Sequence, residues 1–322
     1  MGYYIIRRIL YAIPVLIGIN ILTFILFFMV NTTDDIARMQ LGGKHVTQQD
    51  LDTWKSEHGY DLPLFYNSKH GNITDTMFWN KTIKSFSFDF GPADNGRDIN
   101  QAIAERYAPS LAIAIPALIC GLTLNIIIAM MMAFFRGGYL DTWGMIMCVI
   151  LMSISVLFYI VGIQYFMARL LKWVPISGYA DGLGSIKFVI LPVLVSVIGG
   201  IGAGARWYRS FFVEELQKDY VRTARAKGLS ETKILFKHVL KNTMIPILTG
   251  VVVVLPSLFM GSLLTESFFA VPGLGSYTID AIRNQDFAIV RSMVFLGSLL
   301  YIVGLLLTDI SYIMVDPRIK LK

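Results

Sequence analysis

Long apolar runs alternate with polar segments along this chain, and six of the runs are long enough to cross a bilayer. Crossing the roughly 30 Å hydrocarbon core takes about 20 apolar residues in a helix. The runs are Ile9–Val30, Ala108–Phe135, Trp143–Ala168, Phe188–Ala205, Asn242–Leu264 and Ser292–Val315. Helices are expected, because each backbone N–H and C=O group in lipid must be bonded within its own segment. The pattern predicts an all-α polytopic membrane protein with six transmembrane helices.

The composition agrees with this prediction. The 322 residues are 55% hydrophobic and only 16% charged, with a mean hydropathy of +0.60, whereas soluble domains carry about a quarter charged residues. The first run follows Arg7 and Arg8 and ends without a small-x-small cleavage site, so a retained anchor is expected over residues 1–30. A polar segment over residues 31–107 comes next, followed by a five-span core over residues 108–322.

Lysine and arginine counts predict the orientation, because short cytoplasmic segments carry an excess of both. With the N-terminus inside, the cytoplasmic segments hold 15 of these residues, and the opposite side holds 5 once the long 31–107 segment is set aside. That segment counts weakly in the rule because of its length, and it also carries eleven Asp and Glu residues. We therefore expect both termini to be cytoplasmic and residues 31–107 to be extracytoplasmic.

The 31–107 segment is expected to be ordered but too small for an independent catalytic domain. Gln48–Gly59 is predicted as a short amphipathic helix that stops at Tyr60–Pro63, since proline disfavours helix in the residue before it. Phe86–Gly91 alternates apolar and polar residues before a glycine, which indicates a strand or an edge turn. The three histidines of the segment are too widely spaced to favour a metal site.

A polar, basic loop over residues 206–241 separates the fourth and fifth runs. Apolar residues recur there every four positions, at Phe212, Leu216, Tyr220 and Ala224. They share one face of an amphipathic helix whose other positions are largely charged. Gly228 stands where this helix needs a left-handed residue to turn out of its last turn. Ser230 is then expected to cap a second helix, with Glu231 in its first turn.

Two interpretations of the loop helix remain open from these residues alone. A basic juxtamembrane helix lies on anionic lipid headgroups. A helix seated in a protein groove instead needs small side chains that permit close approach, and Ala224, Ala226 and Gly228 provide them. The small residues favour the protein groove.

Several motifs resemble those of permease subunits in ATP-binding-cassette importers, specifically the oligopeptide, dipeptide and nickel branch. The motifs are Tyr4–Arg8, His58–Leu64, Asp89–Gly91, Arg206–Ser210, Asp219–Leu229, Glu266–Phe269, Pro272–Gly275, Asp309–Tyr312 and Asp316–Arg318. They are spread over the whole chain in the family's order. The broader importer pattern of Glu-Ala-Ala is only partly kept, since Arg222-Thr-Ala224 stands in its place, as is usual in this branch. The resemblance implies the type I importer permease fold and a location in the bacterial inner membrane.

The resemblance also implies that the loop helix is a coupling helix, seated in a cleft of a cytoplasmic ATPase. The residues expected to contact the ATPase are Asp219, Tyr220, Arg222, Thr223, Ala224, Arg225, Ala226, Lys227, Gly228 and Leu229. They belong to a helix predicted over residues 212–230. Closure of the ATPase would rock the spans between inward-open and outward-open states, a two-state change biased by nucleotide.

The energy source is expected on other subunits. The chain contains no G-x-x-x-x-G-K-[ST] phosphate loop, so ATP and magnesium are expected on partners, and no cofactor or metal is expected on this chain. By resemblance, the partners are a homologous second permease, two ATPase subunits or domains and an extracytoplasmic substrate-binding protein, besides the lipid bilayer. Nucleic acid is not expected. The docking surfaces for the binding protein are expected on residues 31–107 and on Glu266–Arg291.

The expected cargo is a peptide, with nickel chelates or other small solutes as the alternative, and no substrate-binding residue is predicted. Two other classes of function compete with the importer. A membrane-embedded enzyme would need a nucleophile with a base, or clustered ligands, inside the spans, and the last run holds only one charged residue, Asp309. We therefore predict no catalytic residue. An ATP-independent secondary transporter would carry intramembrane charges for ion coupling and would not need the basic loop.

Overall fold

The computed structural model describes residues 2–28, 32–42, 46–65, 67, 75–180 and 182–315. These residues form helices, turns and a single β-bridge between Pro92 and Asp98. The helices up to residue 134 are α1 (Gly2–Phe28), α2 (Thr33–Gln40), α3 (Gln48–His58), α4 (Met77–Thr82), the 3-10 helix η1 (Ile83–Ser87) and α5 (Ile99–Phe134). His45, His70 and the Asp316–Arg318 motif lie outside the described residues.

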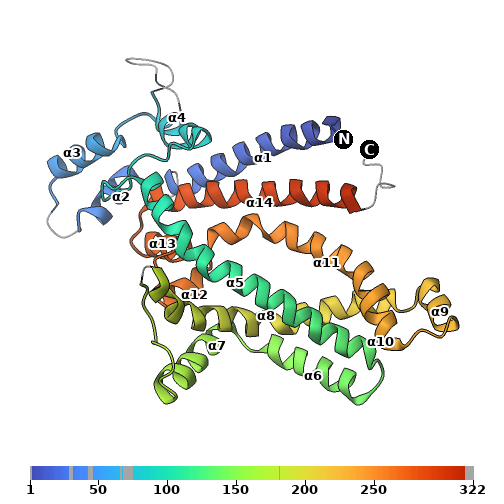
Figure 1. Ribbon diagram of the computed structural model, residues 1–322. Coiled ribbons are helices and arrows are strands. Elements are labelled where there is room, and N and C mark those ends of the chain that lie inside the picture. Colours follow the sequence, from blue (N-terminus) through green and yellow to red (C-terminus); the bar gives the residue numbers. More distant parts are fainter. Residues whose placement is uncertain are drawn as a thin grey trace. The chain divides into compact units, whose positions relative to one another are not determined.

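The second part of the chain is also helical, and Figure 1 shows the order of its elements. They are α6 (Tyr139–Ser153), α7 (Val156–Ile163), η2 (Gln164–Leu170), η3 (Gly182–Ser185), α8 (Ile186–Glu215), α9 (Asp219–Ala226), α10 (Glu231–Ile234), η4 (Leu235–Val239), α11 (Leu240–Val254), η5 (Pro256–Met260), α12 (Leu263–Phe268), α13 (Leu274–Arg283) and α14 (Phe287–Val315). Elements η2 and η4 are π-helical, and η3 and η5 are 3-10 helices.

Among the described residues, five helical runs are long and apolar enough to cross a membrane. They are Ile6–Phe28, Ile99–Phe134, Ile186–Glu215, Glu231–Phe268 and Phe287–Ser311. A sixth candidate is a bent pair, Tyr139–Ser153 with Val156–Leu170. With this pair included, the six spans predicted from the apolar runs are all represented by helices.

The third apolar run is not the continuous helix that the sequence predicts. α6 ends at Ser153, and the axis bends by 91° before α7 begins. Ile154 is extended (φ −89°, ψ 126°), and Ser155 stands at the N-cap position of α7. Ser155 makes no capping hydrogen bond, whereas a β-branched residue such as Ile154 loses side-chain freedom in a helix. Apolar length alone therefore missed this break.

The described residues divide into two compact units. Of the described residues, those within 2–107 and 277–306 form the first unit, and those within 108–276 and 307–315 form the second. Three helices, α5, α13 and α14, contribute to both units. The polar loop between α8 and α11 belongs entirely to the second unit, and the segment after α1 belongs to the first.

In the first unit, short helices pack on the end of α1 through a core of aromatic and aliphatic residues. Thr32 and Thr47 start α2 and α3 with capping boxes, in which each threonine hydroxyl and the carboxylate three residues later accept each other's backbone N–H. The predicted helix is confirmed, but α3 ends at left-handed Gly59 (φ +66°), before the Tyr60–Pro63 stretch that was expected to stop it. The core consists of Phe24, Phe28, Ile36, Ala37, Leu51, Trp54, Tyr60 and Met77.

Phe86–Gly91 does not form the strand that its alternating pattern suggested. The 3-10 helix η1 runs into this stretch, and Phe88 then adopts a left-handed conformation (φ +56°), so the alternative of a turn is the better description. The rings of Phe86 and Phe90 both contact Phe295 of α14, at centroid distances of 5.3 and 6.1 Å. The alternating phenylalanines therefore serve packing against α14, and the stretch does not pair with another strand.

Glycines let α8 pack closely against its neighbours in the second unit. A Cβ at Gly202 would lie 2.6 Å from the backbone oxygen of Cys148 on α6. A Cβ at Gly204 would overlap the side chain of Asn125 on α5. Small residues allow the backbones of membrane helices to approach closely. α8, which leads into the polar loop, is therefore held against both α5 and α6.

Candidate functional site

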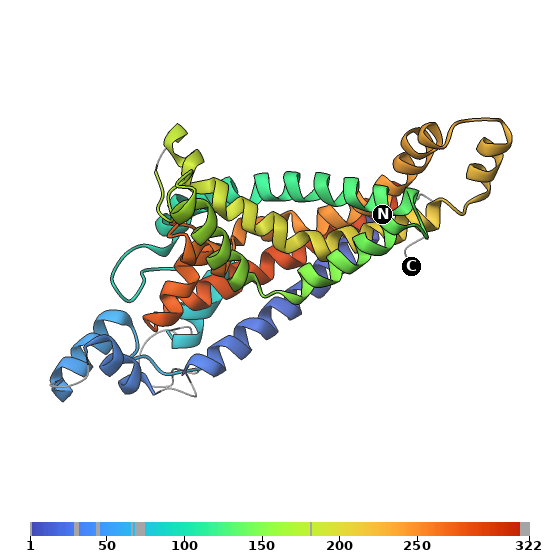
Figure 2. The ribbon, with the colours of Figure 1, turned by 90° about the horizontal axis from the view of Figure 1, so that it is seen from below.

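The polar loop between the fourth and fifth spans contains two short helices, α9 and α10. They follow α8 directly along the chain, and Figure 2 shows them projecting at one end of α8 and α11. All ten residues predicted to contact an ATPase lie on α9 or in the turn that follows it. The sequence therefore located the loop correctly.

The apolar positions that predicted one helix over residues 212–230 lie on two helices instead. α8 ends at Glu215, and α9 begins at Asp219 after Lys218 takes an extended conformation (φ −65°, ψ 149°). Charge placement favours the break. The negative charges of Glu214 and Glu215 are unfavourable at the C-terminal end of α8, where the helix dipole is also negative, whereas Asp219 is favourable in the first turn of α9. The prediction of one continuous helix is wrong for this reason.

The apolar side of α9 packs inside its own chain. Val221 is 0% exposed and Ala224 is 7% exposed, and both join Tyr208 and Phe212 of α8 in one cluster. The other buried members, from α5, α10, η4 and α11, are Ala129, Met130, Ala133, Ile234, Leu235, Val239 and Ile247. Full burial of an aliphatic side chain such as Val221 contributes about 2 kcal/mol. The break before α9 allows this packing, since a continuous helix would carry Val221 and Ala224 away from Phe212.

The opposite side of α9 is exposed and charged. The exposed residues are Asp219, Arg222, Thr223, Arg225, Ala226, Lys227 and Gly228. Tyr220 and Leu229 are half-buried. The structure thus places seven of the ten predicted contact residues at the surface and Ala224 in the core. The small size of Ala224 serves packing within the chain, which differs from the place in a partner's groove expected for it.

Gly228 ends α9 as the sequence predicts. Its φ is +76°, in the left-handed region. The Gly228 N–H donates to the Arg225 carbonyl at 2.9 Å, and the Leu229 N–H donates to the Ala224 carbonyl at 3.3 Å, which is the Schellman arrangement. Arg225 also donates from Nε and Nη2 to the two carboxylate oxygens of Glu231, at 2.7 and 3.0 Å. Backbone and side chains together define the turn from α9 to α10.

Tyr220 fixes the beginning of α9. Its hydroxyl donates to Glu215 Oε1 at 2.9 Å. Burial of the phenol, together with the nearby Glu215 carboxylate, raises the pKa of Tyr220 to about 12, so the hydroxyl remains a donor at neutral pH. Ser230 occupies the predicted N-cap position of α10, but its side chain makes no capping hydrogen bond. α9 is therefore held at both ends and presents its exposed side chains on a defined backbone.

A charged pair joins α8 to α6 shortly before the loop, and the sequence interpretation missed it. Arg209 Nε and Nη2 each lie 2.6 Å from a carboxylate oxygen of Asp141. Asp141 is only 6% exposed and also accepts the Gly137 N–H at 3.0 Å. Bidentate arginine–carboxylate pairs are among the strong side-chain interactions. The signal in the sequence was an acid and an arginine at the polar ends of two apolar runs, 68 residues apart, and no local pattern pairs them.

A second feature, at the end of the fifth span, was seen only as a resemblance. Glu266 is 1% exposed, and its carboxylate accepts backbone N–H groups from Ser262 at 3.0 Å, Gly275 at 2.7 Å and Ser276 at 3.1 Å. A Cβ at Gly273 would overlap this carboxylate. The carboxylate of one motif, Glu266–Phe269, therefore binds the glycine-rich backbone of the other, Pro272–Gly275. These hydrogen bonds fix the turn between α12 and α13.

The α9 surface has the chemistry of a protein-recognition site. It offers exposed cations, small residues and a fixed backbone. Across the part of the chain that the structure describes, no three His, Cys, Asp or Glu side chains gather as a metal site. Directional charges on a preorganised helix suit recognition of a complementary protein surface.

Comparison with known proteins places the chain in a family. The family described as binding-protein-dependent transport system inner membrane component matches residues 125–321, and the N-terminal family of such membrane components matches residues 1–90. The probable peptide ABC transporter permease protein y4tP of Sinorhizobium fredii (strain NBRC 101917 / NGR234) is 31% identical over 326 residues, which cover 99% of this chain and 100% of the relative.

Two further relatives match over nearly their whole length. The dipeptide transport system permease protein DppB of Bacillus subtilis (strain 168) is 29% identical, with 100% of this chain and 99% of the relative covered. The glutathione transport system permease protein GsiC of Escherichia coli (strain K12) is 31% identical, with 99% of each chain covered. The family resemblance and the all-α fold class predicted from the sequence are confirmed. The chain belongs to the family of multi-pass inner-membrane components of binding-protein-dependent transport systems.

Proposed function

We propose that this chain is the membrane-spanning subunit of an ATP-driven importer and that it couples to a cytoplasmic ATPase through the exposed side of α9. The proposal rests on which side of α9 is buried and which side is exposed. Its apolar residues Val221 and Ala224 are buried within the chain, and its charged residues face outward. A helix that lies on lipid would turn its apolar side toward the acyl chains. The buried apolar side therefore favours a protein partner over the membrane surface.

In this proposal both termini and the α9 loop are cytoplasmic, and residues 31–107 are extracytoplasmic. The distribution of lysine and arginine, 15 against 5 outside the 31–107 segment, supports this orientation. ATP and magnesium bind to partner subunits, and the chain itself acts without catalysis. Its sequence has no phosphate-binding loop that would assign ATP hydrolysis to it.

The contacts of α9 provide a route from the ATPase to the spans. Movement of α9 acts on Tyr208 and Phe212 of α8 through the shared apolar cluster. The pair between Arg209 and Asp141 then joins α8 to α6. Packed side chains and ion pairs transmit displacement when they have two discrete arrangements. Through this route, nucleotide-driven closure of the ATPase would switch the permease between its inward-open and outward-open states.

Membership of the family supports a proposal for the remaining partners and for the cargo. A homologous second permease would complete the pathway, two ATPase subunits or domains would drive it, and an extracytoplasmic binding protein would deliver the cargo. Relatives named for peptide, dipeptide and glutathione transport support a peptide as the cargo. The permease would then form half of the route by which the peptide crosses the membrane.

Affinity purification of this chain from its native membrane, followed by mass spectrometry, tests the proposal. We expect a second permease and one or two ATPases to be recovered with it. An ATP-dependent uptake of a labelled peptide by the same complex in proteoliposomes tests the cargo. Recovery of the chain alone from a gentle detergent, together with transport that needs no ATP, would contradict the proposal and favour a secondary transporter.

A further inference from the structure

The break between α6 and α7 exposes backbone groups that are not bonded within the chain. The helix axis bends by 91° there, and Ile154 and Ser155 lie in the bend. The N–H groups of Val156 and Leu157 and the hydroxyl of Ser155 form no hydrogen bond with any described residue. Ile154, Val156 and Leu157 are 40%, 36% and 40% exposed, and Ser155 is also exposed. These polar groups therefore need partners from outside the chain.

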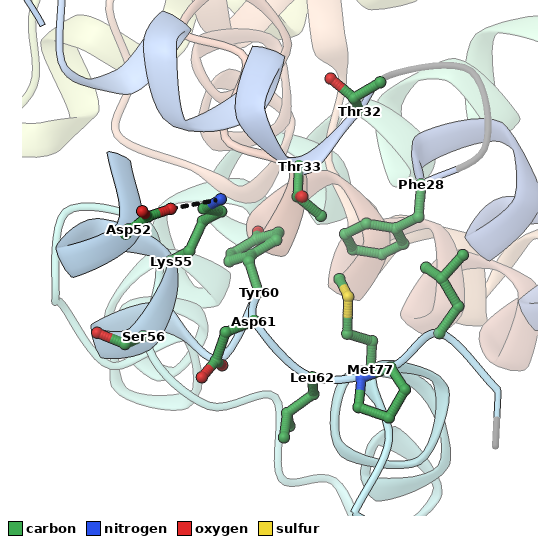
Figure 3. Close-up of a pocket in the computed structure, with 12 residues that line it drawn as sticks. Phe28, Thr32, Thr33, Asp52, Lys55, Ser56, Tyr60, Asp61, Leu62 and Met77 are labelled. Atoms are coloured by element: carbon green, nitrogen blue, oxygen red, sulfur yellow. Dashed lines mark ion pairs between the residues drawn. The ribbon is translucent and has the colours of Figure 1, made fainter. Parts of the chain in front are cut away.

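A cavity in the first unit makes no such demand. It measures about 660 Å³, and the residues that line it include Lys55 and Tyr60 (Figure 3). Lys55 Nζ lies 2.7 Å from Asp34 and 2.9 Å from Asp52, and the Tyr60 hydroxyl donates to Asp94 at 3.4 Å. The ammonium and phenol groups of this cavity are bonded within the chain, whereas the N–H groups at the break are not.

The length of α6 places the break at membrane depth. α6 begins at Tyr139, and the side chains of Tyr139 and Trp143 are 88% and 62% exposed. Exposed tyrosine and tryptophan side chains are typical of the membrane–water interface. The 15 residues of α6 then span about 22 Å. The break therefore lies well inside a hydrocarbon core of roughly 30 Å.

Contacts with α8 indicate the same depth. A Cβ at Gly202 would lie 3.1 Å from the backbone nitrogen of Met152, just before the break. A Cβ at Gly199 would lie 3.9 Å from the ring of Tyr159, just after it. Both glycines are near the middle of α8, which is 30 residues long. The residues on either side of the break thus pack against the middle of a neighbouring span.

Lipid is excluded as the cover of this break. The hydrocarbon core offers no hydrogen-bond acceptor, so irregular backbone at this depth occurs only where it is buried in protein or lines a water-filled cavity. The break is exposed in this chain. A span of a second permease is a poor cover, because the backbone groups of a membrane helix are already bonded within that helix. Water can bond to both the N–H groups and the hydroxyl.

We propose that the break, Ile154–Leu157, lines a water-filled route by which the peptide crosses the membrane. The inference rests on the proposed function, in which this chain forms half of that route. Ser155 presents its hydroxyl to the water, and Val156 and Leu157 present their backbone N–H groups. The side chains of these four residues are apolar except for that of Ser155, so the unbonded backbone is what distinguishes them from a lipid-facing stretch.

Cysteine labelling of the assembled complex tests this inference. Ser155→Cys is made in a chain that also carries Cys120→Ala and Cys148→Ala, so that a single thiol remains. A thiol reacts as its thiolate, which forms in water and is suppressed in apolar surroundings. The matched control keeps Cys120 as the single thiol, because Cys120 is exposed within the unbroken helix α5, which lipid can cover.

Labelling is measured in nanodiscs, with and without ATP, so that both sides of the membrane and both states of the permease are accessible. We expect a water-soluble methanethiosulfonate cation to label Ser155→Cys at least about tenfold faster than Cys120. The attached cation should also reduce ATP-dependent peptide uptake in proteoliposomes about tenfold or more, because it adds bulk and charge to the route.

The outcomes separate this assignment from the proposed function. Equal labelling rates for the two thiols, or labelling of Ser155→Cys that leaves uptake unchanged, would overturn the assignment and leave the importer standing. Slow labelling of Ser155→Cys together with a cross-link from it to the second permease would also overturn it and place the break in the interface between the permeases. Absence of ATP-dependent uptake by the unlabelled wild-type complex would instead contradict the proposed function, whatever the labelling rates.

Discussion

The two polar regions of this protein are built in opposite ways. On α9, charges are exposed and pair with near neighbours in the sequence, as Arg225 does with Glu231. In the first unit, the Asp94 N–H donates to the carboxylate of Asp286, which is buried and lies 192 residues away in the sequence. Exposed ion pairs contribute about 0–1 kcal/mol, whereas a buried polar group that loses its partner costs about 1–3 kcal/mol. The charges of α9 therefore contribute little to the stability of the fold, whereas those of the first unit hold its parts together.

The largest effect on stability is expected from loss of the ion pair between Arg209 and Asp141, which joins α8 to α6. This pair lies shortly before the exposed loop. Arg209→Met leaves Asp141 buried without its cation and should reduce the free energy of unfolding by about 3 kcal/mol. Thermal and denaturant unfolding in detergent measure this change. Arg206→Met, at an exposed position one turn earlier, should change it by less than about 0.5 kcal/mol.

A double variant checks the cause of this loss. Asp141→Asn added to Arg209→Met removes the buried charge and should restore part of the stability. If the double variant is no more stable than Arg209→Met alone, the uncompensated charge is not the reason for the loss.

The next effect concerns the buried contact in the first unit. Asp286→Ala removes the cap of α14 and leaves the Asp94 N–H without its acceptor, so the free energy of unfolding should fall by about 2–3 kcal/mol. The matched control is Asp280→Ala, an exposed acid on α13. Equal melting temperatures for the two variants would show that the buried contact does not hold the first unit.

The charge state of Asp94 gives a comparable effect through pH. Burial and the neighbouring Asp286 carboxylate raise the pKa of Asp94 to about 6, above its ordinary value of 3.8. The folded state therefore binds the proton more tightly than the unfolded state, and stability falls as pH rises from about 4 to 6. The loss amounts to roughly 3 kcal/mol at most. Lys81, whose pKa burial lowers to about 8, stays protonated over this range.

The comparison that isolates Asp94 is the difference between wild type and Asp94→Asn. As pH rises from 4 to 6, the melting temperature of the wild type should fall relative to that of the variant. From pH 6 to 7 the difference between the two melting temperatures should stay constant. A constant difference across the whole range would contradict a raised pKa at this position.

The smallest effect on stability is expected on α9, together with a large effect on transport. Arg222→Glu changes an exposed residue and should alter the free energy of unfolding by less than about 0.5 kcal/mol. Under the proposed function it should reduce ATP-dependent uptake in proteoliposomes about tenfold or more, because it reverses a charge at the ATPase interface. Lys218→Glu makes the same change just outside the predicted contact residues and should retain most uptake. Normal uptake by Arg222→Glu would remove this residue from the interface.

Local patterns predicted much of this fold. Apolar length gave the spans, and the Gly228 turn after α9 was correctly placed because only a left-handed residue ends the helix there. The break at Ile154–Ser155 and the break before Asp219 were missed. Both occur where short polar or charged stretches compete with apolar periodicity, which a count of apolar residues does not register.

Contacts between distant residues were beyond the reach of a single sequence. Nothing local links Arg209 to Asp141, or Asp94 to Asp286. The same holds for the burial of Ala224, which the sequence presents only as a small residue on a charged helix. Pattern shows which side of a helix is apolar, but it does not show whether lipid, a partner or the chain itself covers that side.

The most direct test of the α9 interface is disulfide or maleimide cross-linking to the ATPase from single cysteines at Ala226 and Ala224 in the assembled complex. Both are alanines on the same helix, but Ala226 is exposed and Ala224 is 7% exposed within its own chain. We predict that Ala226→Cys cross-links to the ATPase and that Ala224→Cys does not. Failure of Ala226→Cys to cross-link in a complex that hydrolyses ATP and transports peptide, or equal cross-linking from both positions, would contradict the account.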